Sequence, residues 1–415
     1  MTARSIGAAS PPPQGLRDNI LIRACGEPLN SVEIARRLLY LPPTPDGSGP
    51  YSRHDIERMT AGIFRMHIPT PAGIELAHAV SFMLAEGYVS RDPSNPSTWR
   101  RIYSGIGDQA ATSPIQLGAM VTGVSGAGKS MAIERALHLF PKVVHHESIP
   151  GLAVPSPQLV WLKVDIPASG KIKDLVVTLA RQTDEALGTS NFDRLLHGKR
   201  PSGAEMAHRW LQMVSCNFLG ILVLDEVQNL FKIETKAVRS AMVSRRHVAP
   251  PPLRIVDDEA LKFLLTLSNY AKIPTIYCAT PDGKAALETR MSTAQRMLTA
   301  GLHTIPHASS ADDEFFRKHF FPRLCEYQWF PQKLPASNEF RRLLFDLSAG
   351  VPKIAAMTWF NAVRRALQRR ADCMALEDFR HAAETALGPL RPAVAALLSE
   401  DPRQLQRYED LMGGI

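Results

Sequence analysis

The sequence contains one glycine-rich loop whose residue types and spacing suit phosphate binding. Residues 123–130 have the sequence GVSGAGKS, which is the complete pattern G-x-x-x-x-G-K-S. An apolar segment precedes the loop and a helical pattern follows it, and this motif requires that context. Glycines let the backbone N–H groups converge on phosphates, and the start of the helix contributes the positive end of its dipole. Because a chance match lacks this context, we predict a nucleotide-binding loop.

The residues of this loop have separate expected roles. We expect Lys129 to reach the β- and γ-phosphates of ATP, and the Ser130 hydroxyl to ligate Mg²⁺. The rest of the loop is expected to contact the nucleotide through Gly123, Ser125, Gly126, Ala127 and Gly128. The loop therefore predicts ATP and Mg²⁺ as cofactors.

A second candidate for chemistry is the pair Asp225 and Glu226, which directly follows the apolar run GILVL. A strand buried on both faces has a continuous apolar sequence, and such sheets place ligands at the carboxyl ends of their strands. We expect Asp225 to hold Mg²⁺ through water. Glu226 is expected to orient and activate the attacking water, as in a hydrolase rather than a kinase. Many strands end in acids, but the position of this pair after Lys129 favours an NTP-hydrolysing enzyme.

Four further positions are candidates for the same site. Thr280 follows an apolar segment and could contact the γ-phosphate or the water; a simple turn residue is the equally open alternative. Arg290 and Arg296 lie on the next helical pattern, and we choose Arg296 as an arginine finger supplied to a neighbouring subunit. A solvated surface arginine is the alternative for both. Lys353, near the start of a later helix, could sense bound nucleotide from above.

The elements that must position these residues follow an α/β rhythm. Short apolar runs alternate with helical patterns in the middle of the chain, which predicts a parallel sheet. The predicted strands are Gln116–Thr122, Leu159–Asp165, Gly220–Asp225, Ile273–Ala279 and Leu302–Pro306. The predicted helices between them are Lys129–Phe140, Lys173–Gly188, Gly203–Asn217 and Glu259–Ala271. The fold class is therefore an α/β P-loop NTPase core, with a helical extension before it and a helical lid after it.

The flanking regions have helical patterns without a strand. Before the core, the segment Ser31–Pro42 begins with a serine cap, and Gly87 can cap the end of another helix. We predict five parts: a flexible tail 1–15, a helical N-terminal region 16–113, the nucleotide-binding core 114–311, a helical lid 312–388 and a C-terminal tail 389–415.

Composition narrows the class of protein. Of 415 residues, 45% are apolar and 21% are charged, which excludes a wholly disordered chain. The five scattered cysteines contain no C-x-x-C pair, so we expect a reducing, cytoplasmic setting and no disulfide framework. No apolar run approaches the ~18 residues of a membrane span, so no membrane partner is expected. The net charge of +8 permits nucleic-acid binding without requiring it.

Part of the positive charge lies between the two nucleotide motifs. Residues 151–256 contain 14 Lys+Arg against 9 Asp+Glu. We expect Lys171 and Lys173 to bind phosphates of double-stranded DNA without sequence preference, with Lys163 and Ser169 as weaker candidates. A solvated loop is the alternative. A second DNA-contacting arm could be formed by Arg239, Arg245, Arg246 and Arg254, and the equal alternative is a disordered insertion with no partner. In the lid, one helix carries Arg364, Arg365, Arg369 and Arg370. Such a run is usually a solvated helical face, and the alternative is a surface for an acidic partner or a neighbouring subunit.

Together these motifs resemble the AAA+ ATPases, and more narrowly the transposition regulators of the TnsC and TniB type. The narrower resemblance uses LKVDIPASGKIKDL (162–175), IPTIYCATPDG (273–283), AQRMLTAG (294–301) and SAGVPKIAAMT (348–358). It implies ATP-bound subunits that form rings or helical filaments on double-stranded DNA. Such a homo-oligomer connects a target-selection protein of the TniQ class to the transposase, and hydrolysis disassembles it. The long basic segment 231–258 departs from the pattern of that family.

Two other classes compete with a transposition regulator. One is a different AAA+ ATPase, initiator-like or signalling, that acts on DNA or protein partners. The other is a P-loop kinase, which Glu226 and the helical lid disfavour. ATP-driven phosphate release without an acceptor substrate would exclude the kinase.

The phosphate loop generates the first prediction. Substitution of Lys129 by alanine is expected to abolish nucleotide binding and ATP-dependent assembly, because the ammonium group that neutralises the phosphates is lost. Titration with a fluorescent ATP analogue measures this. Wild-type affinity in the variant would refute the assignment of the loop.

Overall fold

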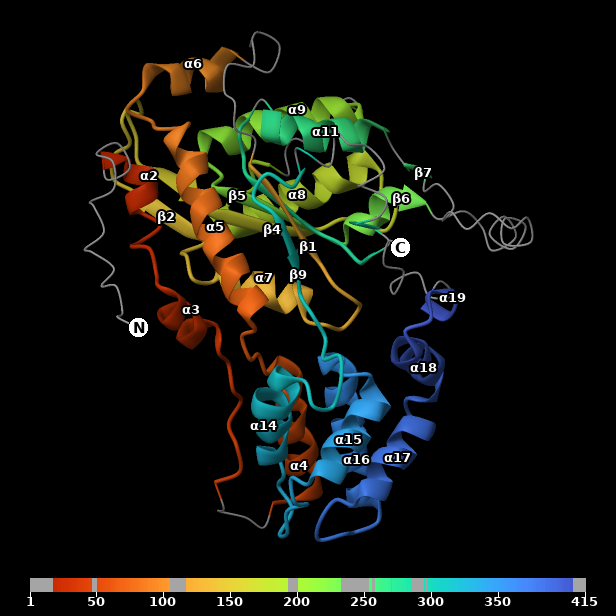
Figure 1. The fold of residues 1–415 in the computed structure, drawn as a ribbon. Coiled ribbons are helices and arrows are strands. Elements are labelled where there is room, and N and C mark those ends of the chain that lie inside the picture. The colour runs from red at the N-terminus through yellow and green to blue at the C-terminus, as the bar shows by residue number, and fades with distance from the viewer. Residues whose placement is uncertain are drawn as a thin grey trace, which may run out of the picture.

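The computed structural model describes residues 18–46, 51–104, 117–192, 201–232, 254–255, 258–269, 271–281, 283–284, 295 and 297–405. A sheet covered by helices forms the upper part of the molecule as drawn in Figure 1, and an all-helical part lies below it. The last described helices return along one side toward the sheet.

Five strands form the central sheet in the order β4-β5-β8-β1-β9, and every neighbouring pair is parallel. The strands are β1 Gly118–Thr122, β4 Trp161–Asp165, β5 Ile221–Asp225, β8 Thr275–Cys278 and β9 Leu302–Thr304. Each lies within a predicted strand, so the predicted parallel α/β core is confirmed. All five carboxyl ends consequently lie along one edge of the sheet.

Two smaller antiparallel pairs accompany this sheet. They are β2 (Val143–His146) with β3 (Ser156–Leu159), and β6 (Phe231–Lys232) with β7 (Arg254–Ile255). The predicted strand Leu159–Asp165 is thus divided, because Leu159 pairs with β2 while the residues from Trp161 onward pair with β5.

Successive side chains of the central strands enter two different cores. In β5, Leu222 and Leu224 enter one core, whereas Ile221 and Val223 enter the other. The first core includes α8 Ile172–Leu187, α9 Gly203–Cys216 and α11 Asp258–Asn269. The second includes α2 Ile20–Arg23, α3 Ser31–Leu38, α5 Pro71–Val89 and α7 Lys129–Leu137. Because both faces of the sheet are covered, the strands have continuous apolar sequences.

The lid has an aromatic core. Its elements are the π-helix η5 Phe316–Phe320 and the α-helices α14 Phe321–Glu326, α15 Asn338–Ser348, α16 Pro352–Gln368 and α17 Leu376–Glu384. Phe340 lies 5.6 Å from Trp359 and 4.7 Å from Phe379, measured between ring centroids. Such aromatic pairs add to the stabilisation from burial alone.

The described N-terminal helices belong to two cores. Whereas α2, α3 and α5 pack with the sheet, α4 (Arg53–Thr60) and the 3-10 helix η1 (Ala61–Arg65) pack on α16 of the lid. Ile56 and Ile63 are buried within the lid core. The Tyr327 hydroxyl also donates a hydrogen bond to the carbonyl oxygen of Pro42 at 2.9 Å. The N-terminal region therefore links sheet and lid.

Arg91 joins this region to the sheet. Its buried guanidinium donates to three carbonyl oxygens, those of Gly87 at 2.9 Å, Leu219 at 2.5 Å and Gly220 at 3.1 Å. Burial is the main reason why the pKa of Arg91 falls to about 10. Because a buried polar group without hydrogen bonds is costly, these three bonds hold the end of α5 against the entry to β5.

Several local expectations are wrong. Helix α3 is capped by Asn30, not Ser31, since the Asn30 side chain accepts the N–H groups of Val32 and Glu33. Gly87 does not end its helix, because α5 continues past it to Val89.

The predicted tail 389–415 also needs correction. Its described residues form the 3-10 helix η6 (Gly388–Leu390) and the α-helices α18 (Arg391–Ser399) and α19 (Pro402–Leu405). Val394 and Ala396 of α18 are buried, and α18 contacts α15 of the lid. This part of the chain is therefore packed on the lid.

The arginine run of the lid is also not a wholly solvated face. Arg369 donates two hydrogen bonds to the buried carboxylate of Asp378, at 2.8 and 2.5 Å. This pair ties the end of α16 to α17, while Arg364 and Arg370 are exposed.

In the described part of the chain, no helix combines the length and apolar character needed to cross a membrane.

The packing of α5 generates the second prediction. A Cβ atom on Gly87 would lie 2.5 Å from Pro274 Cγ and 2.9 Å from Pro274 Cδ, so Gly87→Ala is expected to destabilise the protein by about 1–3 kcal/mol through overpacking. Gly73→Ala in the same helix is the matched control, because its nearest contact would be 3.4 Å away. It should be neutral or stabilise by up to about 1 kcal/mol. Chemical denaturation measures both, and equal stabilities would contradict the prediction.

Candidate nucleotide-binding site

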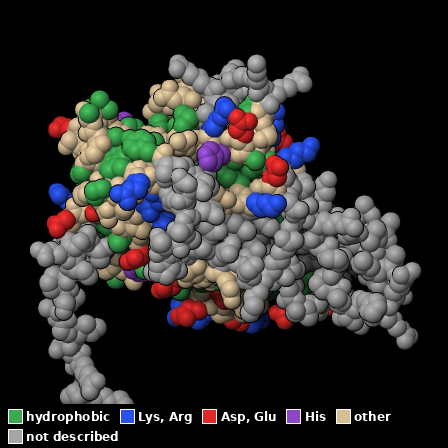
Figure 2. All heavy atoms as spheres, turned by 90° about the horizontal axis from the view of Figure 1, so that it is seen from above, with side chains coloured by type: hydrophobic (Ala, Val, Ile, Leu, Met, Phe, Trp, Pro, Cys, Tyr) green, Lys and Arg blue, Asp and Glu red, His purple; other side chains and the backbone are tan. Residues whose placement is uncertain are grey.

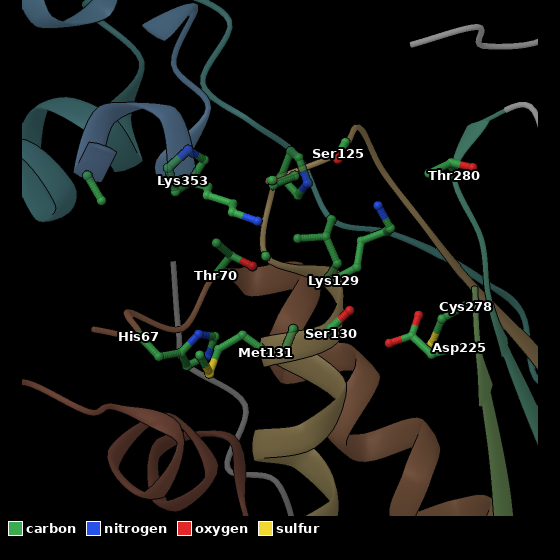
Figure 3. Close-up of a pocket in the computed structure, with 18 of the residues that line it drawn as sticks. His67, Thr70, Ser125, Lys129, Ser130, Met131, Asp225, Cys278, Thr280 and Lys353 are labelled. Carbon is green, nitrogen blue, oxygen red and sulfur yellow. The ribbon is translucent and has the colours of Figure 1, made fainter. Parts of the chain in front are cut away.

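A cavity of 890 Å³ lies where the carboxyl edge of the sheet meets the lid and the N-terminal segment. The phosphate loop, the ends of β5 and β8, and the start of α16 all line it, together with residues between 63 and 70 (Figure 3). Its volume falls within the range of small-molecule sites. The structure thus brings together segments that are far apart in the sequence.

The phosphate loop connects β1 to α7 and is tightly packed. Gly123 has a φ of 149°, and a Cβ atom there would lie 2.5 Å from the carbonyl oxygen of Ile305. Gly126 has a φ of 83°, and its Cβ would meet Val351 and Lys353 of the lid at 3.1 Å. Both positions therefore need glycine, for conformation as well as for space.

Lys129 and Ser130 begin α7 at the cavity wall. The Lys129 ammonium donates to the carbonyl oxygens of Gly123 at 2.7 Å and Val124 at 3.2 Å. In Figure 3 the Ser130 side chain points toward Asp225, the last residue of β5. Ser125 and Ala127 line the same cavity.

The lid contacts the loop directly. The backbone N–H of Lys353 donates to the carbonyl oxygen of Gly126 at 3.2 Å. The side chain of Lys353 extends from α16 toward the phosphate loop (Figure 3). The lid thus contributes a cation to the cavity where the sequence predicts one.

Asp225 has an ion-pair partner that the sequence did not indicate. The Lys163 ammonium lies 3.1 Å from Asp225 Oδ2 and 3.2 Å from Asp165 Oδ1. Lys163 is therefore an ion-pair partner of Asp225, which lines the cavity. A contact between Lys163 and DNA stays a prediction. These two carboxylates contribute to raising the pKa of Lys163, against the lowering effect of its burial.

Glu226 is held by a bridge to Thr280. The side chain of Gln228 donates to Glu226 Oε2, and its own oxygen accepts the backbone N–H of Thr280 at 3.4 Å. Glu226 has a φ of 59°, a left-handed conformation that is uncommon for residues other than glycine and is concentrated at functional sites. No sequence pattern marked Gln228, because its role depends on the proximity of β5 and β8.

The electrostatic surroundings of Glu226 suit a proton acceptor. Burial raises the pKa of Glu226, and the charges of Asp225 and Asp165 raise it further. Lys129 and the hydrogen bond from Gln228 act in the opposite direction. A carboxylate whose pKa is raised is a stronger base than an ordinary glutamate.

The other end of the cavity is apolar. Its lining includes Ile63, Phe64, Met66 and Ile68 of the N-terminal segment, and Phe315 and Phe320 of the lid. His67 lies among them, and burial, with a smaller effect of Arg135, lowers its pKa to about 4. The sequence did not predict these residues, since only the fold brings them next to the phosphate loop.

Other predicted residues lie away from the cavity or outside the described residues. Lys171 is the N-cap of α8, and both Lys171 and Lys173 are exposed. Ser169 donates to Asp174 Oδ2 at 2.5 Å, so its hydroxyl has a local partner. The following lie outside the described residues or have side chains that are not described: Arg239, Arg245, Arg246, Arg254, Arg290 and Arg296.

The residues present fit ATP with a divalent cation. Two cationic side chains, Lys129 and Lys353, line the cavity opposite an apolar end. The buried Thr280 hydroxyl has no hydrogen-bond partner in the described part of the chain. No group of three or more His, Cys, Asp or Glu in that part could hold a metal. Mg²⁺ would consequently depend on hard oxygen donors from Ser130, Asp225 and the phosphates.

The comparison with known families agrees with this geometry. Residues 116–287 match the family described as AAA domain. The core is therefore similar to an AAA domain. Its five-stranded parallel sheet, N-terminal helices and C-terminal helical region form the α/β fold of that class. No curated protein matches the sequence.

Several solved structures resemble the chain. One is the ORC1 protein of Aeropyrum pernix in complex with DNA, with 18% identity, a TM-score of 0.40, and coverage of 64% of this chain and 58% of that chain. Another is Drosophila ORC bound to DNA, with 13% identity, a TM-score of 0.36, and coverage of 92% and 70%. The A. pernix ORC2 protein has 12% identity, a TM-score of 0.38, and coverage of 69% and 64%. The chain thus spans less than two thirds of the two A. pernix chains.

Proposed function

We propose that this protein is an AAA ATPase that binds ATP between its AAA domain and its lid and hydrolyses it. The observation that carries this proposal is the meeting of Lys129, Asp225, Glu226 and Lys353 around one cavity of 890 Å³. Phosphate-binding cations and a water-activating carboxylate are the groups that hydrolysis of a phosphoanhydride requires. The apolar end of the cavity suits the adenine base of ATP.

The residues of the chain divide the work of hydrolysis. ATP with Mg²⁺, when bound, supplies the phosphoryl group and neutralises much of its charge. Lys129 would exchange its two carbonyl partners for phosphate oxygens, and Lys353 would add charge from the lid. Glu226 would orient the attacking water and accept its proton. Gln228 would hold the Glu226 carboxylate in place and connect it to Thr280.

This mechanism generates the third prediction. Glu226→Gln is expected to bind ATP normally and to hydrolyse it about a hundredfold or more slowly, since a general base contributes on that order. Phosphate release and analogue binding are measured in parallel. Glu134→Gln, the same chemical change at an exposed position of α7, is the control and should retain activity. Fast hydrolysis by the Glu226 variant would refute the assigned role.

We also infer that the ATPase acts on DNA or on a protein partner as an oligomer. Support comes from the exposed Lys171 and Lys173, which follow β4 at the carboxyl edge and lie at the start of α8. On the face seen in Figure 2, Lys and Arg side chains are interspersed with Asp and Glu over the described surface.

This surface generates the fourth prediction. Lys171→Ala with Lys173→Ala is expected to weaken DNA binding and to reduce the slope of log K against log salt by about 2, one unit for each lost phosphate contact. ATP binding should stay unchanged. Lys318→Ala with Lys333→Ala, two exposed lysines of the lid, is the charge-matched control. Unchanged DNA affinity in the first pair would remove the assignment.

The biological role has two candidates. The segments quoted for the TnsC and TniB type support a transposition regulator that connects a TniQ-class protein to the transposase. The AAA domain itself supports the broader class of initiator-like or signalling ATPases. Electron microscopy with an ATP analogue and duplex DNA distinguishes them: ring or filament assembly that recruits transposase favours the first, and assembly without recruitment favours the second.

A further inference from the structure

The Lys163 ammonium bridges two carboxylates at the carboxyl edge of the sheet. Its distances are 3.1 Å to Asp225 Oδ2 and 3.2 Å to Asp165 Oδ1. The parallel register pairs Asp165 with Asp225 and Lys163 with Val223. Because side chains two residues apart share a face of a strand, Lys163 and Asp165 point to the same side of β4. That side carries Asp225 and faces α7.

The two carboxylates differ greatly in exposure. The side chain of Asp225 is 6% exposed and that of Asp165 is 69% exposed, while Lys163 itself is 20% exposed. A buried carboxylate needs a cationic or hydrogen-bonding partner, whereas an exposed one is solvated by water. Lys163 therefore neutralises Asp225 in this structure, and Asp165 is a second acceptor within reach.

Asp225 is also the carboxylate expected to hold Mg²⁺, so two cations would compete for it. We propose that Lys163 is a positioning residue that opposes metal loading by holding Asp225, and that it transfers to Asp165 when Mg²⁺·ATP binds. This inference rests on the proposed ATP site. Lys163 would lower the affinity of the site for the metal ion in the absence of nucleotide. It would also neutralise the buried Asp225 carboxylate after the nucleotide dissociates.

The transfer would also affect the start of the next loop. Asp165 is the last residue of β4, and Ile166 donates its N–H to the carbonyl oxygen of Asp225 at 2.9 Å. Asn229 in turn donates to the carbonyl oxygen of Ile166 at 2.8 Å. The loop that leads to Lys171 is therefore attached to the strand whose carboxylate changes partner.

The test measures metal binding directly, with Mn²⁺ as the probe. Mn²⁺ is titrated into the protein saturated with a non-hydrolysable ATP analogue, and free Mn²⁺ is followed by electron paramagnetic resonance. Lys163→Met is expected to tighten Mn²⁺ binding about tenfold, because a competing cation is removed. Lys163→Arg keeps the charge and should stay near wild type. Lys333→Met, an exposed lysine of the lid, controls for the loss of one charge.

Asp165 gives an effect of opposite sign. Asp165→Asn removes the second acceptor, so Lys163 should hold Asp225 more strongly and Mn²⁺ binding should weaken about threefold. In the Lys163→Met background the same change should have almost no effect, because the competing lysine is absent. A merely structural role of these residues would weaken binding in both single variants.

The outcomes separate this inference from the proposed function. Unchanged or weaker Mn²⁺ binding in a folded Lys163→Met variant overturns the inference and leaves the ATP site standing. If that variant does not fold, Asp165→Asn decides alone, and wild-type affinity overturns the inference. Failure of the wild-type protein to bind the analogue at all would overturn the proposed function, and the inference with it.

Discussion

The burial of the central sheet on both faces is the constraint on which the rest of the structure depends. Strands covered on both sides by connecting helices run parallel, so their carboxyl ends share one edge. The phosphate loop follows β1, Asp225 ends β5, and Thr280 follows β8. Residues at the ends of three separate strands therefore line one cavity. The sheet topology alone brings these chemical groups together.

The AAA domain forms only part of that cavity. The lid supplies Lys353, and the N-terminal segment supplies most of the apolar end. Because η1 packs in the lid core while α5 packs on the sheet, a bound nucleotide would contact all three parts of the molecule. Arg91 and its three carbonyl acceptors keep α5 attached to the sheet. A nucleotide bound in this cavity would thereby connect the lid to the sheet.

At the carboxyl edge of the sheet, positive and negative side chains lie close together in groups. The net charge of the chain does not describe this arrangement. Asp165, Asp225 and Glu226 lie together, and Lys129 and Lys163 enter the same region from α7 and β4. The pKa of Glu226 is raised and Asp225 is paired, so neighbouring carboxylates have different expected tasks. The overall charge of +8 describes none of this, because interactions between charges depend on distance and burial.

The sequence by itself determined the strands, the phosphate loop and the acidic pair, since each is encoded by contiguous residues with a local backbone or burial requirement. It could not reveal that Gln228 connects Glu226 to Thr280, because Thr280 lies 52 residues after Gln228 in the chain. It also grouped Lys163 with Lys171 and Lys173 as expected DNA contacts, because the sequence around a lysine does not show whether its side chain is solvated or paired with a buried carboxylate. Strand register and packing decided these contacts, as they depend on residues that only the folded chain brings together.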